Sequence, residues 1–83
     1  MTFFCTVAVE TLNVVLSVQP YQSGDWTWTL RIVRSNVDLD GGVAISKDAA
    51  QVAAQRAFEV RLHRAGLDRC APERYQWKKQ IGG

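Results

Sequence analysis

Few residues of this 83-residue chain could support acid–base or metal chemistry. His63 is the one histidine, and the only carboxylate within helical reach of it is Glu59, four residues earlier. Asp38 and Asp40 precede a glycine pair, but the pattern does not continue as an EF-hand calcium loop does. No phosphate-binding loop or dinucleotide fingerprint is present. We therefore expect no catalytic residue, no metal, no cofactor and no enzymatic activity.

The cysteines Cys5 and Cys70 are far apart in the sequence and belong to no CxxC or Cys/His cluster. That spacing argues against a zinc site. In a reducing compartment we expect both to be reduced, partly buried thiols. A disulfide that ties the first strand to the C-terminal segment is the alternative that the sequence leaves open.

The last third of the chain combines positive charge with aromatic side chains. Residues 56–83 carry seven Arg or Lys against three Asp or Glu, whereas residues 1–55 carry three against five. Arginine, tyrosine and tryptophan are typical of protein-interface hot spots, and an acidic partner would complement them. The candidate partner-binding residues are Arg56, Arg64, Arg69, Arg74, Tyr75, Trp77, Lys78 and Lys79.

Nucleic acid is the alternative partner, because basic residues interleaved with aromatics can bind phosphates and stack on bases. Its candidate residues are Lys47, Arg74, Lys78 and Lys79. The net charge of +2 supports this alternative only weakly. A third hypothesis is self-association through an exposed edge strand.

An alanine-rich helix is predicted over Ser46–Ala65, and among the candidate residues it must position Lys47, Arg56 and Arg64. Ser46 suits the N-cap, and Gly66 suits the left-handed residue that ends a helix. Apolar residues recur between these ends at helical spacing. Because alanine adds little bulk, the large core side chains must come from strands.

Alternating apolar residues predict strands before the helix. The runs are TFFCTVAV (2–9), LNVVLSVQ (12–19) and WTWTLRIV (26–33). The apolar parity changes at Glu10 and Thr11, which indicates either a tight turn or a bulge. We expect Trp26 and Trp28 to fill the space over the helix rather than to form a ligand platform.

Two segments flank the helix. Before it, Asp40-Gly41-Gly42 predicts a turn that leads into a short strand at Val43–Ile45. After it, residues 67–83 form a basic, aromatic tail that can be mobile. Alternation in this tail fits an edge strand, and a short helix that starts at Pro72 is the alternative.

These patterns predict one α+β domain over residues 1–83. Its antiparallel sheet would have three to five strands packed on one helix, in the order β-β-β-β-α-(β). No apolar run approaches the ~20 residues of a membrane span, and the N-terminus lacks the basic region of a signal peptide. We therefore expect a cytoplasmic protein with no membrane contact.

Residues 41–62, GGVAISKDAAQVAAQRAFEVRL, resemble the last strand and second helix of a double-stranded-RNA-binding domain. In that family a lysine-rich motif at the start of the helix binds phosphates. Lys47 matches one of these lysines, whereas Asp48 and Gln51 stand where further lysines are expected. Lys47, at the N-terminus of the predicted helix, joins the basic residues of the tail in the nucleic-acid alternative.

The whole chain is similar in type to small phage- or prophage-encoded accessory proteins, including anti-CRISPR inhibitors. The similarity lies in its size, cytosolic character, sheet-plus-one-helix pattern and lack of catalytic motifs. It implies an inhibitor that docks on a larger host defence complex, and it assigns no residues.

Overall fold

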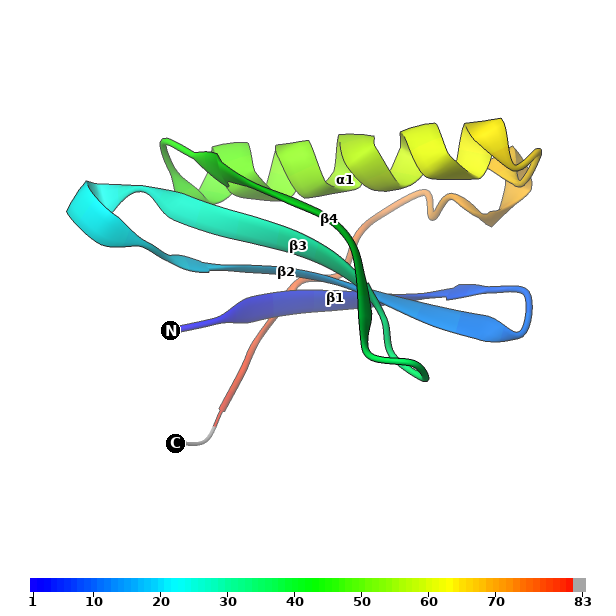
Figure 1. The fold of residues 1–83 in the computed structure, drawn as a ribbon, viewed down its shortest axis with the longest axis horizontal. Helices are drawn as coiled ribbons and strands as arrows, with labels where there is room; N and C mark the ends of the chain where they lie inside the picture. The colour runs from blue at the N-terminus through cyan, green and yellow to red at the C-terminus, as the bar shows by residue number, and fades with distance from the viewer. Residues whose placement is uncertain (82–83) are drawn as a thin grey trace.

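One helix packs on one face of a five-stranded antiparallel sheet and leaves the other face open (Figure 1). The computed structural model describes residues 1–81, so Gly82 and Gly83, the end of the predicted mobile tail, lie outside the described residues. The strand order is β4-β3-β2-β1-β5, which confirms the predicted α+β fold class. The elements are β1 (Phe3–Val9), β2 (Leu12–Pro20), the 3-10 turn η1 (Gln22–Gly24), β3 (Trp26–Ile32), β4 (Val37–Ala44), α1 (Lys47–Arg64), the 3-10 turn η2 (Asp68–Cys70) and β5 (Lys78–Lys79).

The helix begins and ends where its capping residues predict. The Ser46 hydroxyl accepts a hydrogen bond from the Ala49 N–H at 3.1 Å. At the other end Gly66 takes a φ of 71°, a conformation that favours glycine. The Leu67 N–H then donates to the Leu62 carbonyl at 2.8 Å, the bond that defines a Schellman ending.

The core lies between α1 and the faces of the strands beneath it. Leu16 and Leu30 are completely buried, and α1 contributes Ala54 and Phe58. Trp28 packs against this cluster, as predicted for a residue that fills space over an alanine-rich helix. The helix packs mainly on β2, β3 and β4, and this leaves the inner face of β1 to be covered by another part of the chain.

The first two strands are joined by a tight turn. Val9 pairs with Leu12, so only Glu10 and Thr11 lie between them. Odd-numbered residues of β1 pair with even-numbered residues of β2, which explains the change of apolar parity. Glu10 reaches a φ of 55° to close the turn. The tight turn, and not the bulge, is therefore the correct alternative.

The predicted turn at Asp40-Gly41-Gly42 is wrong. The chain reverses earlier, over residues 33–36, where the Asn36 N–H donates to the Ile32 carbonyl at 2.9 Å. The glycine pair continues β4 in register with β3, and Gly42 lies opposite Trp28. A Cβ on Gly42 would stand 2.7 Å from the indole nitrogen of Trp28. Glycine is needed at this position because an indole ring lies against the backbone.

We expect Gly42→Ala to destabilise the fold by about 1–3 kcal/mol, because the added methyl group overpacks the Trp28 ring. In a Trp28→Leu background the same change should cost less, with a coupling of about 0.5 kcal/mol or more. Urea unfolding of the four chains measures both quantities. Equal costs in the two backgrounds would contradict this explanation of Gly42.

Candidate functional site

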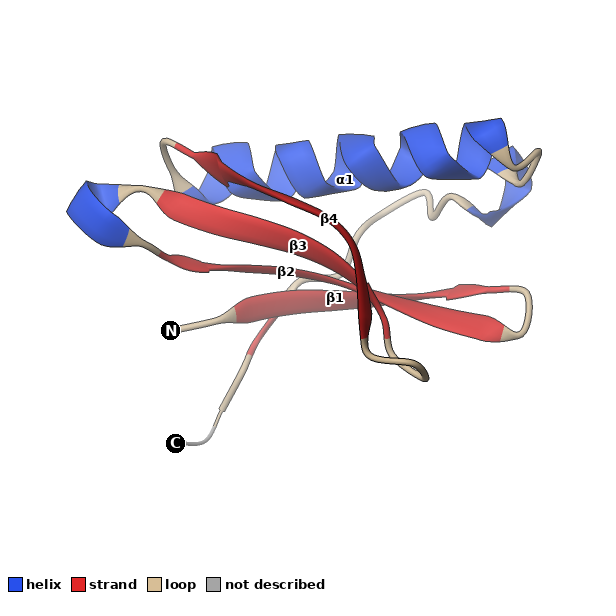
Figure 2. Ribbon diagram, viewed as in Figure 1, coloured by secondary structure: helices blue, strands red, loops and turns tan. Residues whose placement is uncertain are grey.

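The tail, residues 67–81 in the structure, turns back at the end of α1, crosses β1 at a steep angle and pairs with it only at β5 (Figure 2). Its aromatic side chains face the core. The Tyr75 hydroxyl donates to a Glu59 carboxylate oxygen at 2.7 Å, and the Tyr75 ring meets the Phe58 ring edge-on with centroids 6.4 Å apart. Trp77 also packs against the buried cluster. The described part of the tail therefore follows a packed path, and the helix proposed at Pro72 does not form.

Packing of Trp77 leaves one polar atom without a partner. Its indole Nε1 is buried and has no hydrogen-bond partner within the described residues. An unsatisfied buried donor costs about 1–3 kcal/mol. The burial of the large ring on the core offsets that cost, so Trp77 contributes through apolar contact.

Only the first part of β1 is paired on its outer edge. In β5, Lys79 pairs with Phe3 and Lys78 with Phe4, and the Gln80 N–H donates to the Thr2 carbonyl at 2.7 Å. Backbone groups alternate in direction along a strand, so the even-numbered residues of β1 point toward β5. The N–H and C=O groups of Thr6 and Ala8 consequently face outward, and no described strand pairs with them.

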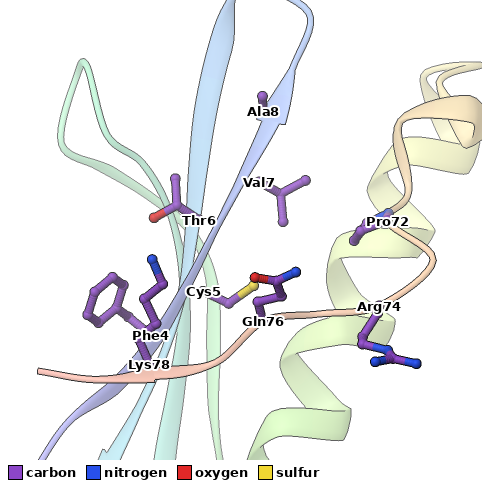
Figure 3. Close-up of a pocket in the computed structure, with 9 residues that line it drawn as sticks. All are labelled: Phe4, Cys5, Thr6, Val7, Ala8, Pro72, Arg74, Gln76 and Lys78. Carbon is purple, nitrogen blue, oxygen red and sulfur yellow. The ribbon is translucent and has the colours of Figure 1, made fainter.

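A cleft of about 350 Å³ lies along this free edge, between β1 and the tail (Figure 3). We call it the edge cleft. Its lining residues are Phe4, Cys5, Thr6, Val7, Ala8, Pro72, Arg74, Gln76 and Lys78. Arg74 and Lys78 stand at opposite ends of it, and Gln76 lies between them beside Cys5 (Figure 3). Arg74, Gln76 and Lys78 are all exposed, and in Figure 3 Gln76 points from the tail toward Cys5 whereas the Arg74 guanidinium lies on the opposite side of the tail.

Both cations of the edge cleft lack an acidic partner. Among the ion pairs of residues 1–81, Arg69 binds Glu10 at 3.3 Å and Arg31 binds Asp38 at 2.7 Å. Neither Arg74 nor Lys78 forms an ion pair within the same residues. The cleft therefore offers two exposed positive charges next to unpaired backbone groups.

The predicted partner-binding residues do not form a single surface in the structure. Arg56 and Arg64 line a shallow depression on the outer face of α1, apart from the residues of the edge cleft. Arg69 is held by Glu10 at the β1–β2 turn. Tyr75 and Trp77 are half-buried on the core. Of the eight predicted residues, the edge cleft brings together Arg74 and Lys78.

The four candidate residues of the nucleic-acid alternative lie in two separate places. The Lys47 ammonium lies over the Phe3 ring, 4.6 Å from its centroid. Lys79 pairs with Phe3 and therefore shares its face of the sheet, whereas Lys78 pairs with Phe4 on the opposite face. Lys47 and Lys79 thus flank Phe3, and Arg74 and Lys78 line the cleft.

The sequence did not identify Thr6, Ala8 and Gln76 as site residues. The role of Thr6 and Ala8 depends on their backbone groups and on the position of β1 near the edge of the sheet, and neither is encoded in residue type. Gln76 could have been found, because it alternates with Tyr75 and Trp77 and so belongs to the polar face of the tail.

The thiol in the cleft lining is shielded. Cys5 is 3% exposed, and burial raises the pKa of its thiol above the ordinary value, against a smaller opposing effect from a backbone hydrogen bond with Gln76. Cys70 is half-buried, and both cysteines are free, so the alternative of a disulfide does not hold in this structure. No group of three or more His, Cys, Asp or Glu side chains among residues 1–81 could hold a metal ion.

In the described part of the chain, no helix is both long enough and apolar enough to cross a membrane. Comparison of the chain with protein-family models, curated proteins and solved structures finds no match.

Thiol labelling with a chromogenic disulfide reagent should report the packing of the tail on β1. We expect Cys70 to react first and Cys5 to react about tenfold more slowly or slower still, because Cys5 is buried and its pKa is raised. Cys70→Ser should remove the fast phase, and Trp77→Ala should accelerate the slow one. Equal rates for both thiols would contradict a packed tail.

Replacement of Tyr75 by Phe should lower the free energy of unfolding by about 1 kcal/mol at pH 8, through loss of the hydrogen bond to Glu59. Burial and that hydrogen bond raise the pKa of Tyr75. The unfolded chain therefore loses this proton from about pH 10 upward while the folded chain keeps it, so stability falls as the pH rises.

Urea unfolding between pH 8 and pH 11 measures the difference between the native chain and Tyr75→Phe. That difference should shrink above pH 10 or so as the unfolded phenol ionises. Tyr21→Phe is the matched control, since Tyr21 is 53% exposed. A constant difference across the range would contradict the assigned role of Tyr75.

Proposed function

We propose that this chain is a small, non-enzymatic protein-binding module that docks on an acidic surface of a larger partner. The observation that carries the proposal is the pair of unmatched cations, Arg74 and Lys78, at the two ends of the edge cleft. Charge complementarity of this kind steers association and selects the partner. Unpaired backbone groups in the same cleft add hydrogen-bonding capacity that a protein partner can use.

The similarity in type to phage accessory proteins supports a more specific form of this function, in which the module inhibits a larger host defence complex. In that form the protein acts in the cytoplasm, where a reducing environment keeps Cys5 and Cys70 as free thiols. Arg56 and Arg64 on the outer face of α1 form a second basic surface, which lies apart from the residues of the edge cleft.

A nucleic-acid partner has less support. Stacking on bases needs exposed aromatic faces, whereas Tyr75 and Trp77 pack against the core of the same chain. The four candidate cations, three lysines and one arginine, are also divided between the surroundings of Phe3 and the edge cleft.

Affinity capture from the cells that encode the chain, followed by titration of the captured protein, tests the proposal. Reversal of both cleft charges, Arg74→Glu with Lys78→Glu, should weaken binding about tenfold or more. The matched variant, Arg56→Glu with Arg64→Glu, changes the net charge equally and should retain binding. Fluorescence anisotropy with duplex RNA, duplex DNA and single strands at ~50 and ~200 mM salt should show negligible affinity.

Two results would contradict this proposal. Equal losses in the two charge-reversed variants would mean that net charge, and not the edge cleft, determines binding. Nucleic-acid binding that falls steeply with salt and is lost in the cleft variant would make Arg74 and Lys78 phosphate contacts.

A further inference from the structure

The edge cleft has the features of a site for strand addition. An extended peptide adds to a sheet by pairing its backbone with an exposed edge, while alternate side chains provide specificity. Edge strands with unpaired N–H and C=O groups are templates for such pairing unless they are blocked. The two edges of this sheet differ in how well they are blocked.

The β4 edge is protected. Its register with β3 shifts between Leu30 and Arg31, which indicates a β-bulge or a similar irregularity. It also carries two acidic side chains, Asp38 and Asp40, and a bulge with charges discourages pairing. The β1 edge has neither device at Thr6 and Ala8, where apolar and small polar residues continue in regular register with β2.

We propose that the edge cleft receives an extended, acidic segment of the partner protein, which pairs with the free edge of β1 as an added strand. This inference rests on the proposed protein-binding function and names the form that the partner takes. The backbone of the segment exchanges hydrogen bonds with Thr6 and Ala8, whose N–H and C=O groups point into the cleft. Its carboxylates pair with Arg74 and Lys78, which have no acidic partner within residues 1–81.

The short pairing of β5 with β1 determines where the strand-addition site begins. β5 occupies the outer edge of β1 only at Phe3 and Phe4, so an added strand can begin immediately beyond Phe4. Gln76 has an exposed side chain in the middle of the cleft and can hydrogen-bond to the incoming segment. Acidic side chains are selected because both ends of the cleft are cationic.

The probe for this site is a labelled heptapeptide, TEVEVET, which alternates carboxylates with β-branched residues and favours an extended conformation. Its matched controls are TKVKVKT and a form of TEVEVET that is N-methylated at alternate residues and so cannot donate along one edge. Anisotropy measures binding to the native chain, to Arg74→Glu with Lys78→Glu, and to Arg56→Glu with Arg64→Glu. Amide hydrogen exchange is followed residue by residue with and without peptide.

We expect TEVEVET to bind the native chain, to lose about tenfold in affinity on reversal of the cleft charges, and to be unaffected by Arg56→Glu with Arg64→Glu. Exchange at Thr6 and Ala8 should slow about tenfold or more on binding, because their N–H groups gain acceptors. Exchange at Cys5 and Val7, which pair with β2, should not change. The N-methylated peptide should bind about tenfold more weakly than TEVEVET.

Loss of binding on cleft charge reversal without slower exchange at Thr6 and Ala8 would overturn strand addition and leave the proposed function standing. If reversal of those charges leaves peptide binding unchanged, both strand addition by an acidic segment and the proposed function are overturned. No binding of TEVEVET at millimolar concentration, or equal binding of TKVKVKT, would overturn the proposal that the added segment is acidic. If the double variant is poorly folded, the single variants Arg74→Glu and Lys78→Glu give the same test. Each should gain affinity for TKVKVKT, and no gain would overturn the role of the cleft charges.

Discussion

One helix is too narrow to cover this sheet, and the rest of the structure depends on that constraint. A helix with its side chains is about 10–12 Å across, whereas five strands spaced by about 4.8 Å extend over about 19 Å. The helix α1 packs mainly on β2, β3 and β4. The buried side chains of β1, among them Cys5 and Val7, therefore need a second cover. The tail provides that cover with Tyr75 and Trp77.

This second cover explains the position of the candidate site. The tail packs its aromatic residues on the core, and its polar residues Arg74, Gln76 and Lys78 line the cleft. Since β5 pairs with only two residues of β1, the tail stabilises the inner face of β1 without completing its edge. The path of the tail therefore explains two features together: the packing of the core under β1 and the exposure of an unpaired strand edge between two cations.

The sequence predicted the helix well because both of its ends carry local signals, Ser46 and Gly66. It misplaced the start of β4, because a glycine pair has the same appearance whether it forms a turn or lies beneath an indole ring. Alternation in the tail was visible, but which side would face the core depends on the distant Phe58 and Glu59. The free edge of β1 depends on strand order, which no local pattern specifies.

The most direct test of this account is the backbone order of the tail, measured by ¹⁵N relaxation on the isolated protein. We predict that the amides of Tyr75 and Trp77 have order parameters of about 0.85, equal to those of β2, because both rings pack on the core. Values below about 0.6 at these residues would show a flexible tail. That result would contradict the account, since β1 would lack its second cover and the edge cleft would lack one wall.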